Sequence, residues 1–118
     1  VTTLHKAYMD SADTYIPIMA GASLDDLFIG SSYSRLTGRR ALEDPEKLKA
    51  VLDYSEKLSE RDLSSVFPLL ALHDQYIRYD VQRPCYGERY VTDLDKGHVT
   101  ALLAVDDIRA HILGVLKT

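Results

Sequence analysis

The residues best suited to chemistry or recognition gather between positions 73 and 90. This stretch holds four of the eight tyrosines and three of the eight arginines of the chain. Tyrosine and arginine are enriched at binding hot spots, and a guanidinium group forms two-pronged hydrogen bonds to carboxylate or phosphate. The pattern predicts a recognition surface for a protein partner or an anionic ligand, with contacts from Tyr79, Arg83, Tyr86, Arg89 and Tyr90. In the alternative interpretation, these tyrosines pack on the rest of the domain while the charges face water.

Two histidines support a second interpretation, in which the domain binds a small anionic molecule. His73 and His98 each fall on the apolar stripe of a predicted helix. A histidine in that position is ordinarily buried and hydrogen-bonded, but it can also act as a general base near neutral pH. A binding protein or small enzyme of this kind has its pocket inside the helical domain. Its predicted ligand-binding residues are His73, Tyr76, Arg78 and His98.

The motifs of metal sites and of common enzyme classes are missing from the sequence. Asp107 and His111 are four residues apart and could share a metal ion, but no second ligand pair and no Glu-x-x-His matches them. No nucleophile signature surrounds Cys85, so we expect an unreactive, partly buried thiol. The chain also lacks a phosphate-binding glycine loop, a dinucleotide fingerprint, a serine elbow and a Cys-x-x-Cys pair. We therefore predict no catalytic residue, no metal and no cofactor, which favours a binding role.

Composition and charge narrow the class of protein. Of the 118 residues, 46% are hydrophobic and 27% are charged, and the formal net charge is −4. These values are typical of one globular domain over residues 1–118. The acidic balance argues against binding to nucleic acid, so a DNA-binding helix-turn-helix around Gly38, with Arg39 and Arg40 beside it, is a weaker alternative. We expect the partner to be another protein or a second copy of the chain.

The sequence favours a soluble, intracellular protein. No apolar run approaches the roughly 18 residues that a membrane-spanning helix needs. The single cysteine, Cys85, excludes an internal disulfide, so folding needs no oxidising compartment. The chain starts without Met, which leaves room for a targeting segment removed in processing.

Helices are expected to position these residues, beginning with three in the first half of the chain. Apolar residues recur at spacings of three and four from residue 3 to residue 15 or 20, which predicts the first helix. The second is predicted over residues 23–38, with Gly38 at its end. The third has the clearest start, because Asp44 can cap it and Pro45 suits the first helical position.

The second half begins with a helix predicted from Ser59. Pro68 interrupts the apolar run that follows, so we expect one helix to stop near Phe67 and another to run on to Asp80. Residues 83–91 lose helical periodicity and are predicted to be irregular. The alternative is a hairpin that pairs residues 76–81 with residues 86–91.

The last helix, predicted from Thr92 to Leu116, is the most strongly periodic segment. Its apolar stripe is wide, which is typical of a helix that faces a core or a partner. Together these elements predict an all-α fold, a single-domain antiparallel bundle of about five helices. The predicted function is that of a non-catalytic interaction subunit or regulator of a larger assembly. The alternative is a small-molecule binding protein or small enzyme.

Overall fold

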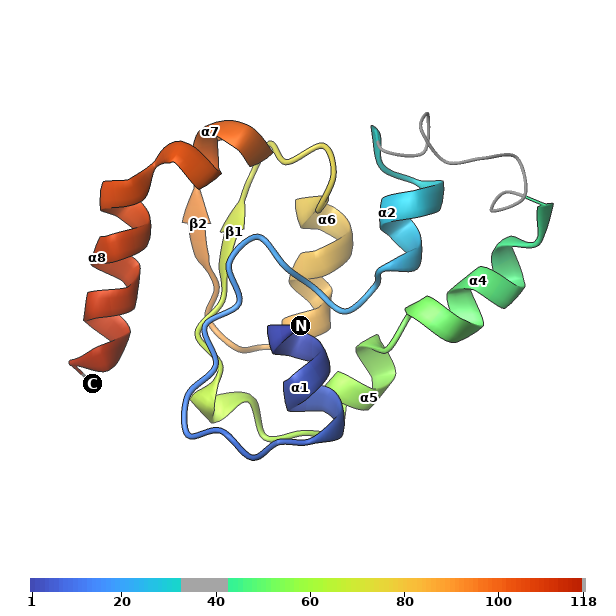
Figure 1. Ribbon diagram of the computed structural model, residues 1–118, viewed down its shortest axis with the longest axis horizontal. Coiled ribbons are helices and arrows are strands. Elements are labelled where there is room, and N and C mark those ends of the chain that lie inside the picture. The colour runs from blue at the N-terminus through green and yellow to red at the C-terminus, as the bar shows by residue number, and fades with distance from the viewer. Residues whose placement is uncertain (33–42, 118) are drawn as a thin grey trace.

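Short helices surround a small parallel sheet (Figure 1). The computed structural model describes residues 1–32 and 43–117. The first half of the chain contains helices α1 (Thr2–Tyr8), α2 (Asp25–Ile29), α4 (Pro45–Leu52) and α5 (Ser55–Ser59). The second half contains the 3₁₀ helices η2 (Leu63–Ser65) and η3 (Arg83–Tyr86), the strands β1 (Leu69–Ala71) and β2 (Thr92–Leu94), and the helices α6 (Tyr79–Gln82), α7 (His98–Leu103) and α8 (Val105–Leu116).

The sheet consists of β1 and β2, and a further extended stretch pairs with the chain just before β1 and at its first residue. Strand β1 pairs in parallel with β2, which places Leu70 opposite Asp93, and the chain returns between the two strands through α6 and η3. On the other side of β1, an extended stretch over residues 15–19 runs parallel to residues 65–69. We call this stretch the edge segment. Because β1 pairs with β2 and has helices over both faces, all three of its residues are buried.

The sheet separates two hydrophobic clusters. The larger cluster includes Tyr15, Tyr54, Leu58, Val66, Leu70 and Tyr86. The smaller cluster consists of Met19, Leu69, Ala71 and Ala101, with Ile18, Leu94 and Ile108 packed against it. Figure 1 shows α7 and α8 on one side of the strands and α1, α5 and α6 on the other. The neighbours Leu69 and Leu70 thus serve opposite clusters, as the alternation of side chains along a strand requires.

The predicted all-α antiparallel bundle is wrong, because strands replace parts of two predicted helices. The apolar run after Pro68 forms β1. A short continuous apolar run suits a strand buried on both faces as well as it suits a helix. Thr92 does not begin the last helix, since it pairs with β1 as the first residue of β2. Helix formation starts only at His98, and a break at Ala104 separates α7 from α8.

The first predicted helix is also too long. α1 ends at Tyr8, and a loop and the edge segment replace its predicted continuation. Asp10 and Met19 have φ angles of +48° and +47°, which lie in the left-handed region and stop a right-handed helix. In the second predicted helix, α2 ends at Ile29. The predicted helix end and basic turn fall outside the described residues, at Gly38, Arg39 and Arg40.

The third helix begins where it was predicted. The Asp44 side chain accepts a hydrogen bond from the main-chain N–H of Lys47 at 3.1 Å, and Pro45 is the first helical residue. The helix predicted from Ser59 is reduced to η2. The hairpin alternative over residues 76–91 is wrong, because this stretch forms α6 and η3, while an irregular stretch follows up to β2.

Candidate functional site

Two of the five predicted partner-binding residues are tied into the fold. Tyr86 is completely buried in the larger cluster, and its hydroxyl donates a hydrogen bond to the Ala20 carbonyl. Burial strongly raises the pKa of this hydroxyl. Arg89 donates from Nε to the Val66 carbonyl at 2.7 Å, and its guanidinium lies 4.7 Å from the centre of the Phe67 ring. The two side chains therefore tie the predicted recognition region to Ala20 and to the residues just before β1.

The other three residues reach the surface to different degrees. Tyr90 is 77% exposed, whereas Tyr79 is half-buried and burial raises its pKa. Arg83 donates a hydrogen bond to the Gly87 carbonyl at 2.8 Å. A groove of about 720 Å³ passes beside Tyr90, and its lining includes Arg61, Leu63, Tyr86 and Arg89. The structure thus brings Tyr86, Arg89 and Tyr90 to one groove, and it places Tyr79 and Arg83 outside the lining.

The carboxylate of Asp74 organises part of the alternative ligand site. Its side chain has no exposed surface. One oxygen accepts the main-chain N–H groups of Tyr76 and Ile77, both at 2.8 Å, and the other accepts the Nδ1–H of His98 at 2.6 Å. The Tyr76 ring meets the His98 ring edge-on, with centroids 5.6 Å apart. Asp74 therefore fixes the orientation of His98 and joins the loop after β1 to the start of α7.

The remaining two residues of that site have carboxylate partners of their own. Arg78 forms a two-pronged ion pair with Asp26, in which Nε donates to Oδ2 at 3.0 Å. This hydrogen bond raises the pKa of the Arg78 guanidinium. His73 pairs with Asp95 on the exposed surface. The sequence predicted Asp26 and Asp95 only as acidic residues in the first turns of two helices, because a single acidic residue carries no spacing signal that reveals its side-chain partner.

The side chains of His111 and Cys85, the candidates for metal binding and nucleophilic chemistry, both make contacts within the fold. The Nε2–H of His111 donates to the Phe67 carbonyl at 2.9 Å and links α8 to the residues just before β1. Among the residues that the structure describes, no group of three or more His, Cys, Asp or Glu side chains could hold a metal ion. Cys85 is buried, and burial raises the pKa of its thiol, which lowers its reactivity.

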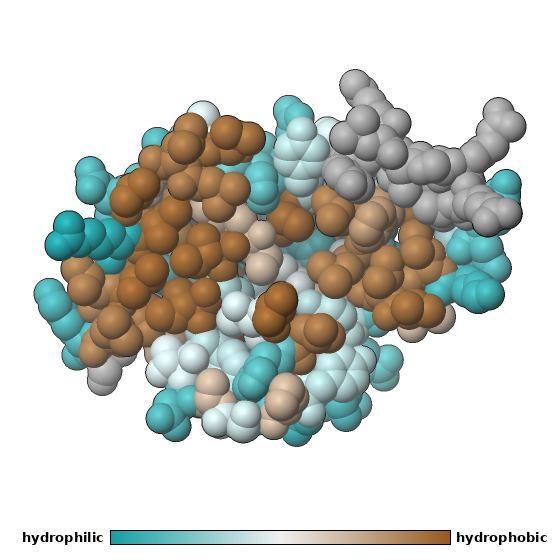
Figure 2. Space-filling model, viewed as in Figure 1, coloured by the Kyte–Doolittle hydropathy of each residue, from teal (hydrophilic) through white to brown (hydrophobic). Residues whose placement is uncertain are grey.

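A row of exposed apolar side chains follows α7 and α8. α8 contains no buried residue, and no helix of the described ranges is long and apolar enough to cross a membrane. We call the exposed set the α7–α8 ridge; it consists of Val99, Leu102, Leu103, Val105, Leu113 and Leu116. Figure 2 shows apolar surface over both helices. Because monomeric proteins rarely expose large contiguous apolar patches, the ridge is a candidate protein-binding surface.

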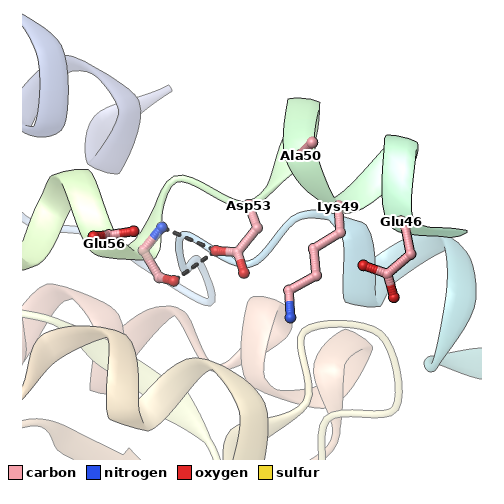
Figure 3. Close-up of a pocket in the computed structure, with 6 residues that line it drawn as sticks. Glu46, Lys49, Ala50, Asp53 and Glu56 are labelled. Atoms are coloured by element: carbon pink, nitrogen blue, oxygen red, sulfur yellow. Dashed lines mark hydrogen bonds between the residues drawn. The ribbon is translucent and has the colours of Figure 1, made fainter.

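A separate open pocket of about 530 Å³ lies along α4 and the start of α5. Figure 3 shows that Lys49 extends between Glu46 and Asp53. Asp53 accepts hydrogen bonds from the main-chain N–H and the hydroxyl of Ser55, at 3.0 and 2.6 Å. The charged side chains of this pocket come from exposed helix surfaces, where ion pairs are weak. The pocket therefore offers no constellation for catalysis.

The chain shares a partial similarity with a protein of known function. No family model matches the chain, and no solved structure matches it. A segment of 50 residues is 42% identical to the C subunit of the aspartyl/glutamyl-tRNA(Asn/Gln) amidotransferase of Chlorobium luteolum. This segment is 41% of the chain and 53% of the relative, so the chain spans about half the length of the curated protein that it matches. Part of the chain is therefore similar to one component of an enzyme assembly.

Proposed function

We propose that this chain is a non-catalytic subunit that docks on a larger protein through the α7–α8 ridge. The similarity over 50 residues to the C subunit of an amidotransferase supports the subunit role. It also favours an aspartyl/glutamyl-tRNA(Asn/Gln) amidotransferase as the assembly to which the chain contributes.

The exposed ridge is the observation that carries the binding role. Leu103 is 74% exposed and Leu116 is 68% exposed, although both lie on helices that pack against the sheet through other residues. Burying a leucine side chain completely contributes about 1.5–3 kcal/mol. A partner that covers the six side chains of the ridge gains this energy, which the isolated chain leaves unused.

The predicted partner-binding residues fit the proposal as a second contact area. Tyr90 presents a large amphipathic ring to solvent, and aromatic rings of this kind are frequent anchors of interfaces. Tyr79 and Arg83 lie nearby in sequence and are half-buried. Tyr86 and Arg89 support this contact area indirectly, because their hydrogen bonds to main-chain carbonyls fix the position of the chain around Tyr90.

Co-expression with the other subunits of this amidotransferase, from the organism of the chain, tests the proposal. We expect the chain to co-elute with them in size-exclusion chromatography. The substitution Leu103→Glu places a charge in the centre of the ridge and should weaken the complex by about 10- to 100-fold, the range for interface hot spots. Dissociation constants from surface plasmon resonance give the measurement.

The matched control is Val51→Glu, on α4. Val51 is 73% exposed, almost the same as Leu103, and also lies on a helix. The control should co-elute like the unmodified chain. Equal losses in both variants would show that the ridge has no special role. An unmodified chain that never co-elutes would remove this amidotransferase as the assembly.

A further inference from the structure

We propose that the outer side of the edge segment, at Ile16 and Ile18, is a second docking site. It takes an extended, uncharged stretch of main chain from the partner protein, which adds to the sheet as a further strand. The identity of the partner rests on the proposed function, whereas the site rests on the hydrogen bonding of the edge segment.

The hydrogen bonds of the edge segment are all made on one side. Tyr15, Pro17 and Met19 bond to residues 65–69 through N–H or C=O groups, over 2.8–2.9 Å. Since successive residues of a strand direct these groups to opposite sides, the groups of Ile16 and Ile18 face away from β1. Within residues 1–32 and 43–117, no group donates to or accepts from the main chain of Ile16 or Ile18.

The main-chain groups of Pro17 point toward β1. The outer side of the edge segment therefore loses no hydrogen-bond donor to the proline. Proline at an exposed edge removes a donor and blocks the addition of a strand. Here the missing donor is the one that would reach the Phe67 carbonyl, and the His111 side chain supplies it instead. Ile16 and Ile18 therefore keep one donor and one acceptor each on the outer side.

The surroundings of the edge favour an uncharged occupant. Ile16 and Ile18 are half-buried, and a charge placed beside them would be costly to desolvate. At the start of the edge segment a pocket of about 390 Å³ opens, and its lining combines apolar side chains with polar ones: Phe67, Val115, Leu116, Asp13, Thr14, Ser64 and Ser65. The pocket has room for a side chain of the docked strand. The other edge of the sheet, on β2, carries Asp93, a charge of the kind that discourages strand addition.

Main-chain complementarity defines the occupant. Alternating donors and acceptors along an edge match an extended chain, and recognition of this kind, β-augmentation, depends little on the sequence of the added strand. In Figure 1 the edge segment crosses in front of β1 as the blue trace, and in Figure 2 the same face carries apolar surface. A strand docked there would lie beside the α7–α8 side of the molecule, where the ridge is.

Amide hydrogen exchange of the isotopically labelled full chain, free and in the amidotransferase complex, tests the site. We expect the amides of Ile16 and Ile18 to exchange rapidly in the free chain and at least about 10-fold more slowly in the complex. The amides of Tyr15 and Met19 are internal controls, because they already donate to the carbonyls of Ser65 and Leu69. They should be protected in both states.

A synthetic peptide gives a second measurement that does not need the complex. The probe is acetyl-Thr-Val-Thr-Val-Thr-Val-amide, titrated at millimolar concentration while the amide resonances of the chain are recorded. Its control carries N-methyl groups on alternate residues, which remove the donors on one side of the peptide. We expect the plain peptide to shift the resonances of Ile16 and Ile18 and the methylated peptide to leave them unchanged.

The outcomes separate the two proposals. A complex in which Ile16 and Ile18 still exchange rapidly overturns the edge site and leaves the proposed function standing. If no complex forms, the proposed function fails and the peptide decides: shifts with the plain peptide alone support the site, and no shifts, or equal shifts with both peptides, overturn it. Protection that grows with the concentration of the free chain assigns the edge to a second copy and also overturns the proposal.

Discussion

Tyr86 shows how a residue type that suggests recognition can instead build the interior. Its ring is completely buried in the larger cluster, and its hydroxyl bonds to the Ala20 carbonyl. Two other weak acids of this cluster, Tyr54 and Cys85, are also buried, and burial raises the pKa of both. The fold therefore holds protons on these groups that the unfolded chain releases at lower pH.

Alkaline pH should destabilise the fold through these groups. In the unfolded chain, the thiol of Cys85 and the hydroxyls of Tyr54 and Tyr86 ionise from about pH 8.5 to 10. Because the folded chain keeps these protons to higher pH, the unfolded state binds fewer protons, and the free energy of unfolding falls as pH rises. We expect the free energy of unfolding to fall above about pH 8, at a rate that approaches 1.4 kcal/mol per pH unit for each ionising group. Urea unfolding at successive pH values measures it.

The variant Tyr86→Phe serves as the control for this prediction. It removes one ionising group and one hydrogen bond, so it should lower the stability at neutral pH and flatten the fall above pH 10. Parallel curves for the variant and the unmodified chain would contradict the role of Tyr86.

Asp74 is the polar residue whose loss should cost the most. Its side chain has no exposed surface, and its carboxylate accepts hydrogen bonds from two main-chain N–H groups and from the ring of His98. We expect Asp74→Ala to lower the free energy of unfolding by about 3 kcal/mol, because it leaves buried donors without partners. Asp74→Asn should cost less, since its amide oxygen can still accept both N–H groups. Identical midpoints of chemical unfolding for the two variants would contradict this account.

At the scale of elements, the sequence predicts those helix ends that contacts within one turn determine. Asp44 and Pro45 define the start of α4 through contacts within one turn, and this start was predicted correctly. Leu69–Ala71 became a strand because of its partners, residues 15–19 and Thr92–Leu94, which lie far away in the sequence. Their apolar periodicity alone did not distinguish a helix from a strand buried on both faces.

Two glycines should respond in opposite ways to the same substitution. Gly114 lies within α8, where an added Cβ meets nothing within 4 Å, so Gly114→Ala should stabilise the fold by roughly 0.5 kcal/mol. At Gly21 an added Cβ would lie 2.0 Å from Oε1 of Gln82. Gln82 is buried and bonds to both main-chain groups of Ser23, so Gly21→Ala should destabilise by about 2 kcal/mol. Thermal unfolding of both variants measures the difference, and shifts of the same sign would refute the prediction.

For the whole molecule, the unequal size of the two clusters predicts which layer opens first. The smaller cluster has four buried residues, and α8 contributes only partly buried side chains to it. The larger cluster has ten buried residues and packs on the other face of the sheet. We expect the amides of α7 and α8 to exchange through a local opening, at least about 10-fold faster than that of Leu58 in α5. Equal exchange rates across both layers would show that the molecule opens as one unit.

The candidate surfaces differ in how far the sequence predicts them. The wide apolar stripe of the last predicted helix indicated a core or a partner, and the structure leaves much of that stripe exposed as the α7–α8 ridge. The sequence does not predict the edge segment, because Pro17 indicates the end or a kink of a helix. The short continuous apolar run from Tyr15 to Met19, with the β-branched Ile16 and Ile18, was a usable signal. The free side of Ile16 and Ile18 depends on pairing with β1, which no local pattern reveals.

The residues at positions 17 and 111 are thermodynamically coupled, because both determine how the Phe67 carbonyl obtains a hydrogen-bond donor. Either a main-chain N–H at position 17 or the ring of His111 can satisfy the Phe67 carbonyl. The substitution Pro17→Ala restores the main-chain donor, and the loss caused by His111→Ala should then shrink in a double-mutant cycle. Once the carbonyl no longer requires it, the His111 hydrogen bond contributes less to holding α8, while Ile108 still packs against the smaller cluster. A change of one side chain at position 17 would thus alter how strongly a distant helix is held to the strand residues.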